Sequence, residues 1–199
     1  MSFYRFAKWL VGPLYRIAFR MRVEGVENVP MQGGVILCAN HSSGHDPVMV
    51  GVASPRPVIF MAKEELFRNP FLRVLIRALG AFPVRRGHPD RAALRRALEV
   101  LESGGCFGVF PEGTRVRGAD LGKAEPGTAY LALKSGATVI PVGVSSSYRL
   151  FRPTVVRFGQ AVDLSAYQTE KLTSEILRSA GDIIMAAIRN QLDGTVRNV

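Results

Sequence analysis

The sequence predicts an α/β fold, a single domain whose mixed and largely parallel sheet is flanked by helices. Short apolar runs bounded by Gly and Pro alternate with amphipathic stretches through residues 34–144, which is the pattern of strand–helix–strand units. The chain has 199 residues, enough for one domain with a full core. Because no repeat or linker divides it, we expect one α/β domain over residues 24–199, preceded by an N-terminal segment, residues 1–23.

The apolar runs predict strands at 22–27, 34–39, 58–62, 80–87, 106–110 and 138–144, and a late pair at 155–158 and 161–164. Amphipathic stretches predict helices at 48–53, 64–79 with a break at Asn69-Pro70, 90–103, 126–134 and 169–192. The last helix should cover the sheet with an apolar stripe made of Leu172, Ile176, Ile183, Ala187 and Ile188.

Composition narrows the partners. The formal net charge of +10 indicates an anionic partner, such as a phospholipid surface, a phosphorylated substrate, an acidic carrier protein or nucleic acid. Cys38 and Cys106 lie in apolar runs, which favours a reducing compartment without disulfides, and no metal site is expected because ligand spacing is lacking. No uncharged apolar stretch reaches the roughly 18 residues of a membrane span, and the N-terminus does not read as a signal peptide.

The N-terminal segment has the composition of a helix that lies in the head-group layer of an anionic membrane. Apolar side chains recur on one arc, namely Phe3, Phe6, Leu10, Leu14, Ile17 and Met21, and basic ones fall on the other, namely Arg5, Lys8, Arg16, Arg20 and Arg22. Gly12-Pro13 is expected to kink or split this helix. The alternative is a helix that packs on the domain core with a solvated basic face.

The chemistry is expected at residues 40–47, where a buried strand runs into a tight turn and a helix start at Asp46-Pro47. This turn can place Asp46 against His41. A neutral imidazole accepts protons near pH 7, and a carboxylate on its other nitrogen fixes the tautomer and stabilises the imidazolium. The plain alternative is a surface His or a helix cap, and His45 is a competing base.

Two further strand ends carry polar residues, Arg85-Arg86 and Glu112-Gly113-Thr114-Arg115. The carboxyl ends of strands in open α/β sheets are where binding residues gather. Arginine offers a planar fork of donors for phosphate oxygens, and Gly113 would allow backbone to approach a ligand. Taken singly, these residues can also be solvated strand ends or local ion pairs.

Together the motifs resemble the glycerolipid acyltransferases that use 1-acyl-sn-glycerol-3-phosphate. The family's Asn-His-x4-Asp block matches Asn40, His41 and Asp46, and its Phe-Pro-Glu-Gly-Thr-Arg block is complete at residues 110–115. Its Arg-ending strand is similar to residues 80–86, with Arg86 a better match than Arg85, and its apolar strand with a central Pro is similar to residues 139–142.

The resemblance implies a glycerolipid acyltransferase-like fold, with His41 and Asp46 as the catalytic base and its partner. It also implies that Arg86, Glu112, Gly113, Thr114 and Arg115 hold the phosphate and glycerol. Secondary candidates are Asn40, Lys63, Arg85 and Pro141.

The implied reaction moves a fatty acyl group from acyl-CoA or acyl-carrier protein to the sn-2 hydroxyl, giving phosphatidic acid, with no cofactor. Attachment to the cytoplasmic face of the cell membrane would be peripheral, through residues 2–23. Three alternatives stay open: another lysophospholipid acceptor, hydrolysis of a thioester or lipid ester by the same pair, and a basic nucleic-acid binder. Nucleic acid is not the expected partner, because no helix-turn-helix or zinc spacing occurs.

Overall fold

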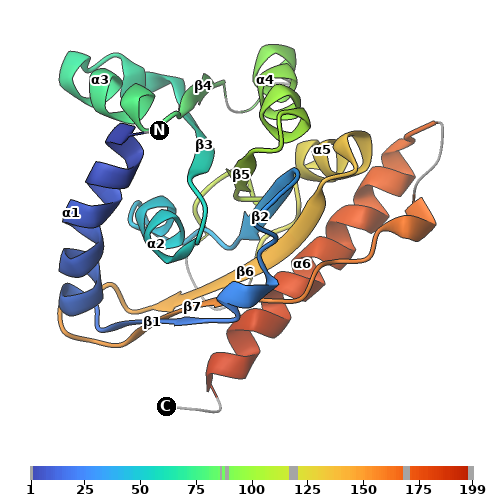
Figure 1. Ribbon diagram of the computed structural model, residues 1–199. Helices are drawn as coiled ribbons and strands as arrows, with labels where there is room; N and C mark the ends of the chain where they lie inside the picture. The colour runs from blue at the N-terminus through green and yellow to red at the C-terminus, as the bar shows by residue number, and fades with distance from the viewer. Residues whose placement is uncertain (1, 86, 88–89, 117–120, 168–170, 197–199) are drawn as a thin grey trace.

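The computed structural model describes residues 2–85, 87, 90–116, 121–167 and 171–196 (Figure 1). In that part of the chain, seven strands form one sheet in the order β1-β7-β6-β2-β5-β3-β4. They are β1 (Met21–Glu24), β2 (Val35–Ala39), β3 (Val58–Lys63), β4 (Phe82–Val84), β5 (Cys106–Val109), β6 (Thr138–Ser146) and β7 (Thr154–Phe158). All neighbouring strands are parallel except β6 and β7. The expected mixed and largely parallel sheet is confirmed.

The helices are α1 (Ser2–Ala18), α2 (Asp46–Ala53), α3 (Pro70–Ala78), α4 (Arg91–Glu102), α5 (Pro126–Ser135) and α6 (Ser174–Val196). Local signals set several ends. Asn69 accepts from the Leu72 amide at 3.1 Å at the start of α3, and Asp90 accepts from the Ala93 amide at 3.0 Å at the start of α4. Gly136 ends α5 with a φ of 62°, a conformation that suits glycine.

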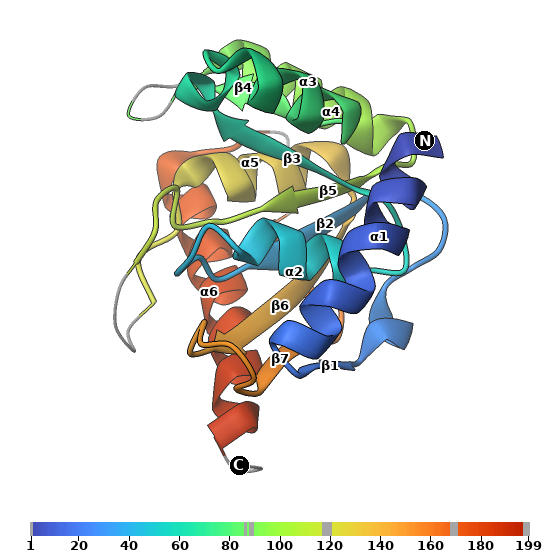
Figure 2. The ribbon, with the colours of Figure 1, turned by 90° about the vertical axis from the view of Figure 1, so that its left-hand side faces the viewer.

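Helices cover both faces of the sheet: α4, α5 and α6 lie on one side and α1 and α2 on the other (Figures 1 and 2). In the central strand β2, Val35, Leu37 and Ala39 point into the core beneath α2, and Ile36 and Cys38 into the core beneath α4–α6. A strand buried on both faces reads as an unbroken apolar run. Because β2, β3, β4, β5 and β6 are parallel, their carboxyl ends share one edge of the sheet.

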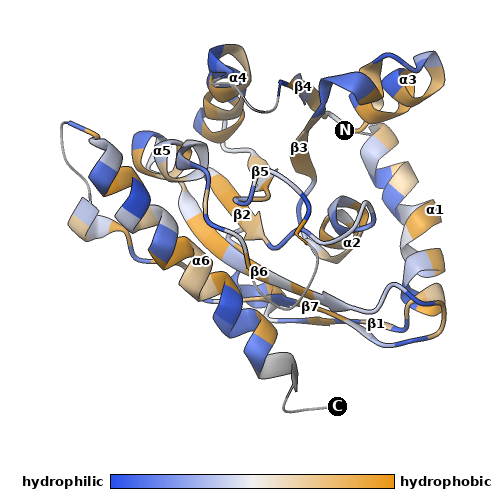
Figure 3. Cartoon of the chain, turned by 180° about the vertical axis from the view of Figure 1, so that it is seen from behind, coloured by the Kyte–Doolittle hydropathy of each residue, from blue (hydrophilic) through white to orange (hydrophobic). Residues whose placement is uncertain are grey.

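Helix α1 turns its apolar arc away from the domain. Five side chains of that arc are 40–69 % exposed, namely Phe3, Phe6, Leu10, Leu14 and Ile17, and the neighbouring Trp9 is 72 % exposed. Met21, which was expected on the same arc, lies beyond the helix in β1 and is buried. The inward side packs Val11, Tyr15 and Ala18 on the core. Two polar contacts add to this packing: the Tyr4 hydroxyl accepts from the Val58 amide at 3.1 Å, and Lys8 Nζ donates to the Ser54 carbonyl. The helix thus packs on the core, as the alternative expected, but through its other side, so that the apolar arc is exposed. Lys8 belongs to the domain-facing side, whereas Arg5 and Arg16 are exposed. Figure 3 shows apolar colour along α1 and α3 as well as in the sheet.

Four local expectations need correction. Helix α1 is not split at Gly12-Pro13. Pro13 removes a hydrogen bond only from the carbonyl four residues earlier, on Trp9, which lies on the exposed arc where water can replace it. Residues 161–164 do not form a strand: after the Gly159 amide bonds to the Pro141 carbonyl, the chain leaves β7, and only the Val162 amide returns to β6, at the Val139 carbonyl.

The third correction concerns the last helix, which begins at Ser174 and buries Ala180, Ile184, Met185 and Ile188. Ile183 and Ala187 of the expected stripe are only half-buried. The apolar pairs 183–184 and 187–188 fit either face by periodicity alone, so packing decides between them. The fourth correction concerns Asp46, which starts α2 but does not cap it, as described next.

Candidate active site

The turn after β2 is fixed to its neighbour strand by Asn40. This buried side chain bonds both backbone groups of Val144 on β6: its amide donates to the carbonyl at 3.0 Å, and its oxygen accepts from the amide at 2.7 Å. An asparagine thus continues the sheet pairing where the backbone of β2 turns away. The following residue, His41, is held at a defined point at the carboxyl edge of the sheet.

His41 and Asp46 form the expected pair. His41 Nδ1 lies 2.9 Å from Asp46 Oδ2, and both side chains are buried, at 5 % and 0 % exposure. The imidazole ring stacks on the Phe110 ring, with centroids 4.1 Å apart and planes 21° apart. Because the carboxylate occupies Nδ1 as acceptor, Nδ1 carries the proton and Nε2 keeps a lone pair. This is the tautomer that a general base requires.

The Asp46 carboxylate gathers donors from the turn and from a more distant residue. Oδ2 accepts from the amides of Ser42 and Ser43, each at 2.7 Å, as well as from His41, and Oδ1 accepts from the Tyr148 hydroxyl. Asp46 therefore caps the preceding turn and not its own helix. Burial alone would raise the pKa of Asp46, but the hydrogen bonds from His41, Tyr148, Ser43 and Ser42 outweigh it and lower that pKa. The group stays ionised beside the imidazole.

Glu112 fastens the loop after β5 to His41. Oε2 accepts from the His41 amide at 2.9 Å, and Oε1 accepts from the Gly122 amide at 3.4 Å. The Val116 amide donates to the His41 carbonyl at 2.8 Å, so both backbone groups of His41 are bound to this loop. Burial raises the pKa of Glu112, and the hydrogen bond from His41 opposes that rise. Both carboxylate oxygens accept from backbone amides, which makes Glu112 a holder of the turn.

Arg115 reaches the same turn from the loop after β5, the loop that also carries Glu112. A methyl group added to Gly44 would lie 3.3 Å from Arg115 Nη2, so the guanidinium lies next to the turn between His41 and Asp46. Thr114 and Arg115 are exposed. Gly113 has a φ of 66°, in the left-handed region that favours glycine. The structure therefore brings the first and third motifs together.

The other candidates lie apart from His41 or outside the described residues. Arg86 falls in the latter group. Arg85 pairs with Glu64 at 3.1 Å and helps to line an open groove of about 440 Å³ beside β4, three strands from β2, or about 14 Å at the usual strand spacing. Lys63 pairs with Glu65 at 3.2 Å at the end of β3. Pro141 lies buried in the middle of β6, opposite Cys38.

Sequence reasoning missed Tyr148. Its hydroxyl contacts both Asp46 and, at 3.0 Å, the Ser42 hydroxyl. Burial and the neighbouring Asp46 carboxylate raise the pKa of Tyr148 far above its ordinary value, so its hydroxyl stays protonated and donates a hydrogen bond to Asp46. The available signal was the polar sequence after β6, because Tyr148 follows three serines at a fourth strand end. The competing base, His45, instead bonds the Tyr15 hydroxyl at 2.9 Å through Nδ1.

A mostly parallel α/β sheet with a buried His–carboxylate pair and an arginine at its carboxyl edge is an arrangement that can activate a hydroxyl group by general-base chemistry. Among the described residues, no three His, Cys, Asp or Glu side chains come together in a way that could hold a metal ion.

The family model described as Acyltransferase matches residues 20–145, which include every motif discussed above. The chain belongs to the Acyltransferase family and is an acyltransferase.

Several relatives are similar over most of the chain. A 1-acyl-sn-glycerol-3-phosphate acyltransferase of Borreliella burgdorferi is 31 % identical over 182 residues, which cover 84 % of this chain and 70 % of that protein. The Bacillus subtilis enzyme of the same name is 28 % identical over 75 % of this chain and 76 % of its own length. A lyso-ornithine lipid O-acyltransferase of Pseudomonas aeruginosa is 32 % identical over 69 % of this chain and 52 % of its own length.

A crystal structure shows the same fold. The 1-acyl-sn-glycerophosphate acyltransferase of Thermotoga maritima superposes with a TM-score of 0.70 at 27 % identity, over 100 % of this chain and 78 % of that one. The α/β architecture with its flanking helices is thus the architecture of a solved acyltransferase.

Proposed function

We propose that this acyltransferase moves a fatty acyl group from acyl-CoA or acyl-carrier protein to the free sn-2 hydroxyl of 1-acyl-sn-glycerol-3-phosphate, giving phosphatidic acid. The observation that carries the proposal is the buried pair in which His41 Nδ1 meets Asp46 Oδ2 at 2.9 Å. The names of the relatives from Borreliella burgdorferi, Bacillus subtilis and Thermotoga maritima support the acceptor.

Nε2 of His41 accepts the proton of the lipid acceptor's hydroxyl group as the hydroxyl oxygen attacks the thioester carbonyl carbon. A C–O bond forms, the tetrahedral oxyanion collapses, the C–S bond breaks, and the proton passes from His41 to the departing thiolate. Asp46 stays ionised and stabilises the imidazolium between these two steps. General-base help of this kind contributes about 10²–10⁴-fold to the rate.

The oxyanion of the intermediate needs nearby donors, and the structure narrows the choice among the turn amides. Those of Ser42 and Ser43 donate to Asp46, and that of Gly113 donates to the Phe110 carbonyl at 3.0 Å. We therefore propose the Gly44 amide, in the same turn, as a donor to the oxyanion. We assign the acceptor phosphate to Arg115 with Thr114, while the assignment of Arg86 stays a prediction from the sequence.

Membrane attachment is part of the proposal. None of the helices in the described ranges combines the length and apolarity needed to cross a bilayer. The outward apolar arc of α1, with Trp9 exposed to 72 %, supports a segment, residues 2–23, that lies in the head-group layer on the cytoplasmic face. The acyltransferase domain, residues 24–199, would then take its acceptor from the bilayer. The last residues of the segment, in β1, already join the sheet.

A second acceptor class deserves a place in the test, because the relative from Pseudomonas aeruginosa is named for a lyso-ornithine lipid. The name of this relative indicates the same acyl-transfer step on an acceptor with a different head group. The choice between the two acceptors depends on whether a phosphate is required at Arg115.

The test is a product assay with purified protein, labelled acyl-CoA or acyl-carrier protein, and a panel of lysolipids. We expect phosphatidic acid, with His41→Ala and Asp46→Asn slower by about 10²–10⁴-fold. The matched control is His45→Gln, whose histidine faces Tyr15. Far-UV circular dichroism shows that each variant is folded. Near-normal rates for the first two variants would refute the assignment, and full-speed fatty acid release without acceptor would identify a hydrolase.

A further inference from the structure

In the turn between β6 and β7, residues 147–152, one part contacts the candidate active site and the other part is exposed to solvent. We call it the β6–β7 turn. Its first part contains Tyr148, whose hydroxyl bonds Asp46 in the site. Its tip consists of Leu150 and Phe151, which are 64 % and 65 % exposed. The Phe151 amide donates to the Ala18 carbonyl at 2.6 Å, so the tip is fastened to the end of α1.

Two residues of this turn have backbone conformations that are unfavourable for their residue type. Tyr148 has a φ of 53° and Phe151 a φ of 60°, in the left-handed region that residues other than glycine rarely adopt. The fold maintains both conformations in six residues. One aromatic ring is thereby turned towards Asp46 and the other is left in solvent, where it gains nothing from the domain core.

The surroundings of the tip are cationic. Exposed Arg149 and Arg152 flank it, and Arg16 and Arg20 lie at the end of α1. The sequence has no acidic residue between Glu125 and Asp163 and none before Glu24. An exposed apolar tip ringed by arginines complements anionic lipid head groups above an acyl layer. In Figure 2, which turns this side to the viewer, α1, α3 and the β6–β7 turn all lie on the facing side.

We propose that the β6–β7 turn is a second membrane contact, whose Leu150 and Phe151 enter the head-group layer of an anionic bilayer, and that Tyr148 links this contact to Asp46 as a positioning residue. The inference rests on the proposed function, because an enzyme that takes a lipid acceptor benefits if contact with the bilayer positions its active site. This contact would add to the anchoring by residues 2–23.

The first experiment measures membrane contact without turnover, so that its outcome is independent of the acyl-transfer assay. The full chain is sedimented with vesicles of phosphatidylglycerol and phosphatidylcholine. We expect Leu150→Ser/Phe151→Ser to lower the partition coefficient about tenfold. The control is Met31→Ser, equally exposed at 64 % but before the amino end of β2, which should change it by less than about twofold. Wild-type partitioning of the double variant would overturn the membrane contact.

A gain-of-signal variant guards against misfolding in the double variant. Trp9 is the sole tryptophan of the sequence, so Trp9→Phe combined with Phe151→Trp places one reporter at the tip. Insertion should shift its emission to the blue on vesicles, and brominated lipids should quench it. Emission that stays unchanged on vesicles that the protein demonstrably binds would also overturn the contact.

The second experiment tests the link through Tyr148. The rate on vesicles is divided by the rate on a short-chain acceptor dispersed as monomers. We expect a ratio above one for the wild type and a ratio near one for both Leu150→Ser/Phe151→Ser and Tyr148→Phe, although Tyr148→Phe should still bind vesicles. A Tyr148→Phe enzyme that keeps the wild-type ratio, or a wild type that shows no preference for vesicles, would overturn the link.

Discussion

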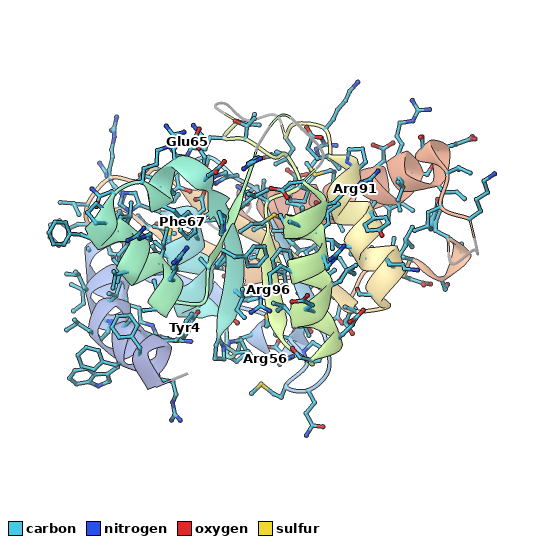
Figure 4. The ribbon with its side chains drawn as sticks, turned by 90° about the horizontal axis from the view of Figure 1, so that it is seen from above. Tyr4, Arg56, Glu65, Phe67, Arg91 and Arg96 are labelled. Carbon is cyan, nitrogen blue, oxygen red and sulfur yellow. The ribbon has the colours of Figure 1, made fainter. Side chains whose placement is uncertain are left out.

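The two edges of the sheet use polar side chains in opposite ways. At the amino edge, Arg56 Nη1 donates to the Pro30 carbonyl at 2.7 Å and Nη2 donates to the Gly104 carbonyl, so a cation ends on backbone groups. At the carboxyl edge, Asn40 and Glu112 also bind backbone groups. In addition, the His41 and Tyr148 side chains both hydrogen-bond the Asp46 carboxylate. Figure 4 labels Tyr4 and Arg56 at one end of β3 and Glu65 at the other, which shows the separation of the two edges.

The difference teaches where stability and chemistry reside. A guanidinium that donates to backbone carbonyls of two loops holds these loops together, and it has no lone pair with which to accept a proton from a substrate. Side chains that hydrogen-bond one another can share a proton and leave one nitrogen, His41 Nε2, for a substrate. Variants at the amino edge should therefore change the free energy of unfolding alone, and variants at the carboxyl edge should change rates more than stability.

The largest effect that sharpens this contrast is expected at Glu112. Glu112→Ala removes the acceptor of the buried His41 amide, so we expect His41 to shift and kcat to fall by about 10²-fold, the usual result of a misplaced catalytic group. Steady-state kinetics on the purified variant measures the loss. Glu112→Gln is the matched control, since its amide oxygen can still accept from His41. If the alanine variant kept its full kcat, Glu112 would not hold His41 for catalysis.

The second effect is expected at the amino edge. Arg56→Ala leaves two loop carbonyls without their donor, which should lower the free energy of unfolding by about 2 kcal/mol. These loops precede β2 and β5, whose far ends carry His41 and Glu112, but kcat should stay within about twofold because the strands themselves remain packed. Urea denaturation and kinetics on the same sample separate the two quantities. A large fall in kcat with unchanged stability would break the contrast between the edges.

Features of the fold and the site could be predicted from the sequence where the residues that form them lie close together in the chain. The pairing of His41 with Asp46 was predictable because the two residues lie five positions apart in one turn. The exposed arc of α1 left two readings open, since an apolar arc fits a core and a membrane equally. Its outward orientation is decided by Tyr4 and Lys8, which bond to residues about fifty positions away.

Tyr148 could not be predicted for the same reason. It lies 102 residues after Asp46 in the chain, and its contact depends on the left-handed backbone of the β6–β7 turn, which no periodicity reports. The role expected for Glu112 at the glycerol end came from the family resemblance. The contact with the His41 amide, 71 residues away, comes from the pairing of β2 with β5. Periodicity predicts elements, whereas the sheet order selects which side chains meet.

The third effect tests Tyr148 through pH. The lowered pKa of Asp46 means that its interactions stabilise the fold above the ordinary value of 3.8 and are lost as pH falls through the lower folded value. Tyr148→Phe removes one donor to the carboxylate, so it should cost about 1 kcal/mol of unfolding free energy near pH 7. The cost should shrink below pH 3.8. Denaturant titrations of both proteins across this range measure it, and a cost independent of pH would mean that the hydroxyl acts by packing.

The smallest effect is expected for Lys8→Met, which tests how α1 is attached. Lys8 donates to the Ser54 carbonyl at the end of α2, and burial lowers the pKa of its ammonium group, so desolvation offsets much of what the hydrogen bond contributes. Methionine has a side chain of similar length, and it removes both the hydrogen bond and the desolvation cost of the ammonium group. We therefore expect a change of only about 0.5 kcal/mol in unfolding free energy, with kcat unchanged. A loss several times larger would show that α1 is an integral part of the fold, and that the amino edge depends on this cation as much as on Arg56.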